Sequence, residues 1–223
     1  MKKIKTILKN IYNRILRHRL PHKISVHNGV PVEDHARLFD FSDTVPDHEA
    51  ELIAAIRTQV REDNKVTLIG GGLGVSTVAA AEATGRRGTV ETYEGSAKQY
   101  SVVKNTVNLN QAEDCINVNH AIVGSYLDFS SKKYGVPGNA EIVKPAALPK
   151  SDVLVLDCEG AEIEILSNIS YRPRVIIVES HGFLDAPEED IKEILLEKGY
   201  EITNRRVESE SSGIVILTAV QPE

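Results

Sequence analysis

Beyond residue 65, short apolar runs alternate with stretches of helical periodicity. Five runs of strand character come first, at residues 66–69, 89–93, 116–121, 153–156 and 175–178. Helices are expected before the first run, at residues 47–62, between most of the runs, and after the fifth, at residues 188–198. Strands at residues 200–205 and 213–220 complete the pattern. Repeated strand, helix, strand units predict an α/β fold with a doubly wound, mostly parallel, seven-stranded sheet.

The first 23 residues follow a different pattern. Apolar residues recur at helical spacing, at positions 4, 7, 8, 11, 15 and 16, and Lys and Arg occupy mostly the positions between them. The pattern predicts a basic amphipathic helix, ended by Pro21 and too charged to span a bilayer. Such a helix can lie on an anionic membrane surface, or pack on its own domain or on a second subunit of a homo-oligomer, and the pattern leaves these alternatives open. We expect an irregular connection with a short strand or turn over residues 24–46, and a single domain over residues 47–223.

The composition fits one cytoplasmic globular domain. Hydrophobic residues make up 41% of the chain and charged residues 26%, and with four Phe and no Trp the core must be mainly aliphatic. An aliphatic core suits a buried parallel sheet. Cys115 and Cys158 are too few for a disulfide framework, and the N-terminus does not resemble a secretory signal. We therefore expect a reducing, cytoplasmic setting, with peripheral contact at the inner membrane face as the alternative that the basic segment allows.

The charge is unevenly distributed along the chain. Residues 1–23 contain eight of the 26 Lys and Arg and no Asp or Glu, so the rest of the chain carries 18 basic against 32 acidic residues. A body with this acidic excess repels nucleic acid phosphates. We therefore expect no nucleic acid partner and a small-molecule, glycan or glycolipid substrate instead.

A glycine-rich loop follows the first strand. Gly70, Gly71, Gly72 and Gly74 lie directly before a predicted helix, where bare glycines let a ligand approach the backbone. The loop lacks the Lys of a phosphate-binding P-loop, and its spacing differs from the G-x-G-x-x-G of dinucleotide sites. The pattern predicts that these glycines bind a nucleotide-type cofactor.

Residues at the ends of the second and third strands fit an adenosine ligand. Glu94 stands 20 residues after Gly74, where a carboxylate can accept both hydrogen bonds of a ribose diol. Asn119, His120 and Ala121 end the third strand and are expected to contact the adenine. The spacing therefore predicts that the cofactor contains adenosine.

Ionisable residues end the fourth and fifth strands. Asp157 and Glu159 share one face by the period of two, as do Glu179 and His181, so the four groups are expected to converge. Packing alone does not favour such groups at buried strand ends, because an unpaired buried carboxylate is costly. The cluster indicates a catalytic site. Since it contains a single His, we rank a proton acceptor above a metal ligand set and predict no metal site.

Neighbouring residues receive structural interpretations. Cys158 alternates with the two acids and is expected to be a small core residue. Glu162 and Glu164 fit a solvated helix face.

The segment that follows the fourth strand resembles a known motif. Residues 157–166 read D-C-E-G-A-E-I-E-I-L and are similar to the D-x-E-G-A-E-x-x-x-L segment of the FkbM family of SAM-dependent methyltransferases. Supporting similarities are the glycine loop, Glu94, Asn110, the A-I-V-G run at residues 121–124 and the V-E pair at residues 178–179. The resemblance covers roughly residues 45–220. It implies a Rossmann-like, class I methyltransferase fold, S-adenosyl-L-methionine (SAM) as cofactor, and methyl transfer to a hydroxyl or carboxyl group of a glycan, glycolipid or secondary metabolite.

Two positions depart from the family pattern. The family usually has an acid where this chain has Leu68, and an Asn where it has Gly72. Loss of that acid would remove a polar contact near the amino-acid end of SAM. These departures keep open a non-catalytic binding or scaffold protein with the same fold.

With methyl transfer as the reaction, the cluster receives specific roles. We expect Asp157 and Glu159 to lie nearest the methyl group, with Asp157 also binding SAM, and His181 to accept the proton of the acceptor hydroxyl. A nicotinamide-dependent oxidoreductase is the third alternative. It would require a pair such as Tyr and Lys at short catalytic spacing, which Tyr134 and its neighbouring lysines do not form.

Overall fold

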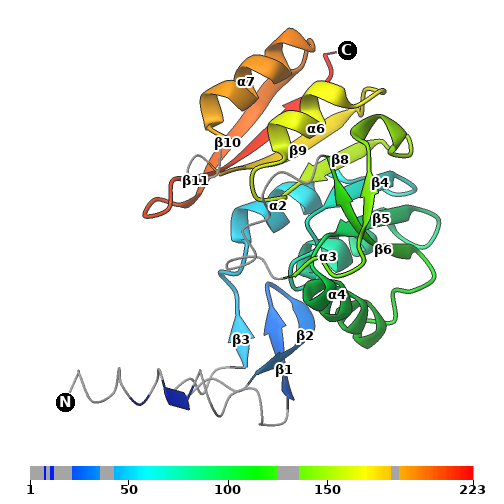
Figure 1. Ribbon diagram of the computed structural model, residues 1–223, viewed down its shortest axis with the longest axis vertical. Helices are drawn as coiled ribbons and strands as arrows, with labels where there is room; N and C mark the ends of the chain where they lie inside the picture. The colour runs from blue at the N-terminus through cyan, green and yellow to red at the C-terminus, as the bar shows by residue number, and fades with distance from the viewer. Residues whose placement is uncertain are drawn as a thin grey trace.

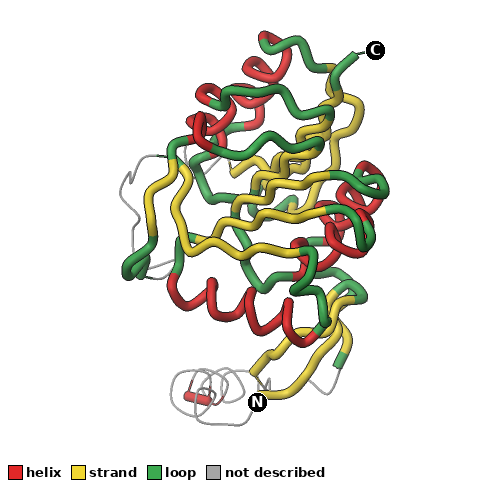
Figure 2. Tube along the Cα trace, turned by 90° about the vertical axis from the view of Figure 1, so that its right-hand side faces the viewer, coloured by secondary structure: helices red, strands yellow, loops and turns green. Residues whose placement is uncertain are grey.

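The computed structural model describes residues 22–35, 43–124, 136–181 and 186–222, together with residues 8, 11 and 12. Among them, an eight-stranded sheet of order β10-β11-β9-β8-β4-β5-β6-β7 forms the centre, with helices on both faces (Figures 1 and 2). Its strands are β4 (Lys65–Ile69), β5 (Thr89–Glu94), β6 (Ile116–Val123), β7 (Glu141–Val143), β8 (Val153–Leu156), β9 (Val175–His181), β10 (Glu201–Ser209) and β11 (Ile214–Val220). The helices are α2 (Ala50–Gln59), α3 (Val75–Thr84), α4 (Ala97–Leu109), α6 (Glu162–Asn168) and α7 (Glu188–Glu197), with a 3-10 turn η3 (Pro145–Ala147).

The sheet confirms the predicted doubly wound α/β fold. Neighbouring strands from β7 to β9 run parallel, and β11 lies antiparallel between β9 and β10. Strand order reverses at β4, from which β5 and β6 extend to one side and β8 and β9 to the other. The seven predicted strands are all present. The eighth, β7, was not predicted because it has only three residues, none of them buried.

The core lies in two layers, one on each face of the sheet. Strand β8 shows the reason, because Val153 and Val155 join the hydrophobic cluster beneath α2, α3 and α4, whereas Leu154 and Leu156 join the cluster beneath α6 and α7. All four side chains are fully buried. A strand covered on both faces reads as a continuous apolar run. Polar residues at the end of such a strand therefore mark the edge of the sheet where a ligand can enter.

The segment before α2 differs from the expected irregular connection. It forms a three-stranded sheet from β1 (His22–His27), β2 (Val30–His35) and β3 (Thr44–Val45). Asn28 and Gly29 join β1 and β2 with positive φ angles of 47° and 91°, as a two-residue hairpin turn requires. The Asn-Gly pair was a sequence signal for this hairpin that the prediction missed. Val30 and Val32 are fully buried in the core beneath α2 to α4, so the hairpin packs on the domain.

The predicted basic helix at residues 1–23 lies almost entirely outside the described residues. Its amphipathic character therefore stays a prediction. None of the described helices has the length and hydropathy of a membrane-spanning segment.

A distant carboxylate holds the start of helix α2. Glu208 on β10 accepts hydrogen bonds from the backbone N–H groups of Ala50, Glu51 and Leu52, at 3.0, 2.8 and 3.3 Å. These N–H groups have no partner within the helix, and the helix dipole favours a negative charge there. The contact anchors Glu49, the residue that precedes the helix, beside the carboxyl ends of β4 and β8.

Candidate functional site

The glycine loop is tied to the end of strand β5 by a single carboxylate. Glu94 Oε2 accepts the backbone N–H groups of Gly71 and Gly72, at 3.0 and 3.1 Å, and Oε1 accepts that of Ser96, at 2.8 Å. Burial raises the pKa of Glu94, against the lowering effect of these three hydrogen bonds. The residue predicted to bind ribose therefore also holds the loop in shape. A carboxylate offers about four acceptor positions, so it can still accept from a ligand hydroxyl.

The glycines of the loop are needed for different physical reasons at different positions. A Cβ atom on Gly70 would lie 1.7 Å from the carbonyl oxygen of Asp157, so this glycine is required by the close approach of the loop to the end of β8. Gly72, by contrast, has open space, and a Cβ atom there would have only Glu49 Oε1 nearby, at 3.7 Å. Gly74 directly precedes helix α3 and has a φ of 83°. Of these three, Gly72 is the position at which a ligand has room to approach the backbone.

The predicted adenine contacts line a cavity of about 510 Å³ at the end of β6. Asn119, His120 and Ala121 are among its lining residues. The Asn119 amide donates to Glu91 Oε2, at 3.1 Å, and His120 stacks on Tyr100 with ring centroids 4.9 Å apart. His120 also pairs in register with Glu94 on β5. The cavity therefore adjoins the position predicted for ribose. That the residues lining it contact adenine stays a prediction.

The acids of β8 and β9 converge on His181. Its Nε2 atom lies 3.2 Å from Glu179 Oε1, 3.7 Å from Asp157 Oδ1 and 3.8 Å from Glu159 Oε2. The structure thus brings together the four groups that the strand pattern predicted to converge. We call the opening at the carboxyl ends of β8 and β9, beside these four groups, the mouth. The exposure of these side chains differs. Those of Asp157 and Glu159 are 19% and 37% exposed, whereas that of His181 is only 3% exposed.

Glu162 belongs to this cluster, contrary to the expected solvated helix face. It is fully buried, and its Oε1 atom lies 3.1 Å from His181 Nδ1. The backbone N–H groups of Cys158 and Gly160 donate to the same carboxylate, at 3.2 and 2.7 Å. Glu162 therefore fixes both the turn after β8 and the orientation of the imidazole. Cys158 packs against the cluster beneath α6 and α7, as expected of a small core residue.

Electrostatics change the role expected of His181. Burial lowers its pKa, but the hydrogen bonds that the ring donates to Glu162 and Glu179 outweigh that effect and raise the pKa to about 10. Both ring nitrogens are then donors at neutral pH, and the ring has no lone pair with which to accept a proton. Burial raises the pKa of Asp157 and that of Glu179, and repulsion from Glu179 raises that of Asp157 further. The carboxylates of Asp157 and Glu159 are more exposed than the imidazole, and the part of each group in proton transfer stays a prediction.

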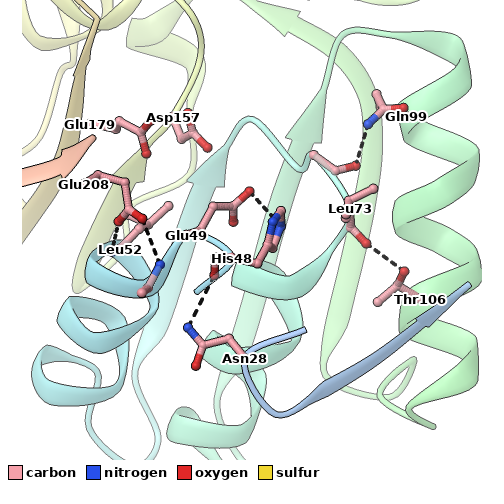
Figure 3. Close-up of polar contacts among 12 residues, drawn as sticks. Asn28, His48, Glu49, Leu52, Leu73, Gln99, Thr106, Asp157, Glu179 and Glu208 are labelled. Carbon is pink, nitrogen blue, oxygen red and sulfur yellow. Dashed lines mark hydrogen bonds and ion pairs between the residues drawn. The ribbon is translucent and has the colours of Figure 1, made fainter. Parts of the chain in front are cut away.

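Two further acids surround this mouth and were not predicted as site residues. Figure 3 shows Glu49 and Glu208 below the facing carboxylates of Asp157 and Glu179. Glu49 has a left-handed backbone, with φ 47°, and contacts His48 Nε2 at 3.2 Å. A non-glycine residue in this conformation is strained, which is common at ligand sites. The sequence offered no signal for either, because both are brought to the site by the pairing of distant segments.

Comparison with known proteins supports the predicted resemblance. Residues 140–202 match the family model described as the methyltransferase FkbM domain. The matched segment contains β7, β8, α6, β9 and α7, and with them Asp157, Glu159, Glu162, Glu179 and His181. A search of curated proteins finds no significant match.

Solved structures with the same fold are methyltransferases and related proteins of low sequence identity. The chain is similar to P. horikoshii TYW2 in complex with MeSAdo (17% identity, 91% of this chain and 72% of that one, TM-score 0.56). It is also similar to the Methanococcus jannaschii fibrillarin pre-rRNA processing protein (16%, 90% and 82%, TM-score 0.55). A third is the O-methyltransferase from Bacillus cereus in complex with SAH (18%, 77% and 79%, TM-score 0.50). These likenesses confirm the class I methyltransferase fold.

Proposed function

We propose that this methyltransferase, which carries an FkbM domain match over residues 140–202, uses SAM to methylate a hydroxyl group of a glycan, glycolipid or secondary metabolite. The observation that carries the proposal is the position of two chemically different sites at one edge of the sheet. The glycine loop with Glu94 suits adenosine, and the acids that end β8 and β9 suit a positively charged group. The cofactor would supply an already activated methyl group on a sulfonium.

Residues of this chain would hold the two ends of the cofactor. Glu94 would accept a hydrogen bond from ribose at its remaining acceptor position, and Gly72 provides the open backbone beside it. The backbone of Asp157 lies against Gly70 of the loop, and its carboxylate, at the end of β8, would complement positive charge. Glu49 adds a second carboxylate over Gly72. Glu49 therefore provides a negative charge near the end of the cofactor at which Leu68 replaces the acid of the family pattern.

The acceptor would meet the exposed side of the acid cluster. Asp157 and Glu159 project toward the mouth, and we assign to them the orientation of the hydroxyl and the acceptance of its proton. Orientation within a near-attack geometry contributes about 7 to 11 kcal/mol, and a positioned base adds about 10²- to 10⁴-fold. His181 and Glu162 lie behind these carboxylates and position them.

An acidic mouth favours an acceptor without phosphates. Glu49, Asp157, Glu159, Glu179 and Glu208 all lie at or beside it, which disfavours a polyanionic substrate. The fibrillarin protein named above is described as a pre-rRNA processing protein, but that likeness extends to the fold alone. A neutral hydroxyl of a sugar or a secondary metabolite fits the charge of the mouth.

The acceptor class is tested by incubating cell extract with the protein and SAM labelled in its methyl group. We expect label in the glycan, lipid or small-molecule fraction, and none in RNA, because the mouth repels phosphates. Mass spectrometry of the separated fractions locates the label. Label that appears only in RNA or protein would contradict the proposed acceptor. The Asp157→Asn variant, which lacks a proposed base, gives the background level of label incorporation.

We propose that the basic segment at residues 1–23 also brings the enzyme to an anionic membrane surface. Each Lys or Arg near such a surface contributes about 1 kcal/mol. Removal of residues 1–20, which leaves β1 intact, should abolish co-sedimentation with phosphatidylserine vesicles at low salt and leave SAM affinity unchanged. Full-length protein that stays in the supernatant would show that the segment packs on protein instead.

A further inference from the structure

We propose that Asp157, Glu179 and His181 form a binding site for one divalent cation of the Mn²⁺ type. The three side chains extend from the ends of β8 and β9, and one ligand atom of each lies within 4.8 Å of the other two. The sequence ranked a metal below a proton acceptor because the cluster has a single His. The geometry supports a metal site despite the single His. The site is a property of the chain itself and does not depend on the identity of the acceptor.

The separations of the ligand atoms fit a common ion. Two ligands each about 2.0 to 2.2 Å from an ion, at angles of 90° to 120°, lie about 2.8 to 3.8 Å apart. His181 Nε2 lies 3.2 Å from Glu179 Oε1 and 3.7 Å from Asp157 Oδ1. Two carboxylates and one imidazole suit Mn²⁺ and related first-row ions. Binding would displace the proton that the neighbouring acids favour on His181 Nε2, while Nδ1 keeps its proton toward Glu162.

The orientation of the imidazole is the one that metal sites use. Glu162 contacts Nδ1 at 3.1 Å and is fully buried, so the second nitrogen, Nε2, faces the two carboxylates. A histidine that binds a metal usually donates its other ring N–H to a carboxylate or carbonyl, which fixes the tautomer. Glu162 is itself held by two backbone N–H groups. Glu162 and His181 are thus preorganised for an ion.

An unsatisfied oxygen provides independent support for a missing ligand. Glu179 is only 6% exposed, and its Oε2 atom has no hydrogen-bond partner among the residues that the structure describes. An unpaired buried carboxylate oxygen is costly, and native structures rarely leave one without a reason. Figure 3 shows this carboxylate beside that of Asp157. A cation between them would satisfy both groups.

The position of the site indicates what the ion would do. Asp157 and Glu159 form its more exposed side, so an ion there lies between the buried histidine and the space open to the acceptor. A divalent cation at that place can coordinate the acceptor oxygen and favour loss of its proton. This consequence rests on the proposed methyl transfer, whereas the binding site itself does not.

The test is a titration of the purified, chelator-treated full-length chain with MnCl₂, followed by the electron paramagnetic resonance signal of free Mn²⁺. We expect one saturable site per chain below about 1 mM, loss of at least 10-fold in affinity in Glu179→Gln, and loss of about 10- to 100-fold in Glu162→Gln, which removes the partner of Nδ1. Circular dichroism of each variant establishes that it is folded.

Glu208→Gln is the matched control. It removes the same charge near the cluster, but its carboxylate contacts the start of α2 and not His181. We expect Mn²⁺ affinity within about 3-fold of the unaltered chain. Equal losses of Mn²⁺ affinity in Glu208→Gln and Glu179→Gln would show that the ion is attracted by the acids in general and not bound at this site, which would contradict the proposal. Absence of saturable Mn²⁺ binding by the unaltered chain would also overturn it. SAM binding measured on the same samples separates failure of the metal site from failure of the proposed function.

Discussion

The Glu94→Ala variant is expected to lose about 100-fold or more of its affinity for SAM, measured by isothermal titration calorimetry. A charge-assisted hydrogen bond to ribose, contributing about 1.5 to 3 kcal/mol, would be removed, and the glycine loop beside the ligand would lose the carboxylate that holds it. The unaltered chain is expected to bind SAM and its demethylated product but not NAD. The structure adds a second effect, because the N–H groups of Gly71, Gly72 and Ser96 lose their acceptor. We therefore also expect the free energy of unfolding to fall by about 2 to 4 kcal/mol.

Two further variants separate these effects. Glu94→Gln keeps the size of the side chain and one acceptor oxygen, so its stability should fall less than that of Glu94→Ala, whereas its loss of SAM affinity should be similar. Glu82→Ala removes an exposed acid of the neighbouring helix α3 and should change neither quantity. A folded Glu94→Gln protein with unchanged affinity would place the ribose contact elsewhere, and heat on addition of NAD with none on addition of SAM would exclude the methyltransferase assignment.

The Gly70→Ala variant is expected to be at least about 4 kcal/mol less stable than the unaltered chain, or not to fold. The added Cβ atom would lie 1.7 Å from the carbonyl oxygen of Asp157 and 2.6 Å from its carbonyl carbon. These are backbone atoms beside the β4–β8 pair, where the Asp157 N–H donates to the Ile69 carbonyl at 2.9 Å. The clash cannot be relieved by rotation of a side chain. Urea denaturation measures the change, as a lower midpoint at an unchanged m-value.

Gly213→Ala is the matched control for this prediction. Gly213 also has a positive φ, of 62°, but nothing lies within 4 Å of its added Cβ atom. It therefore measures the backbone cost alone, about 1 to 2 kcal/mol. Similar losses in the two variants would mean that the loop does not approach β8 as closely in solution.

The fold could be predicted from local patterns because most strands of the central sheet have a recognisable apolar run in the sequence. Continuous apolar runs such as residues 153–156 arise when both faces of a strand are buried, and the helices between them set the parallel order. The pattern failed where an element is short or its signal is a turn. β7 has three residues, and the hairpin of β1 and β2 depends on Asn28 and Gly29.

The sequence by itself determined which strand ends carry the candidate site residues: the glycine loop, Glu94, and the acids and histidine after residue 156 all follow apolar runs. Only the tertiary structure decided how these groups act on one another. Glu162 turns inward to His181, the carboxylate of Glu208 crosses from β10 to the start of α2, and Glu49 reaches the loop beside Asp157. The physical reason is that periodicity reports which face a residue occupies, whereas ionisation and ligand geometry depend on distances of a few ångströms between distant segments. Those distances exist only once the sheet has formed and excluded water from the cluster.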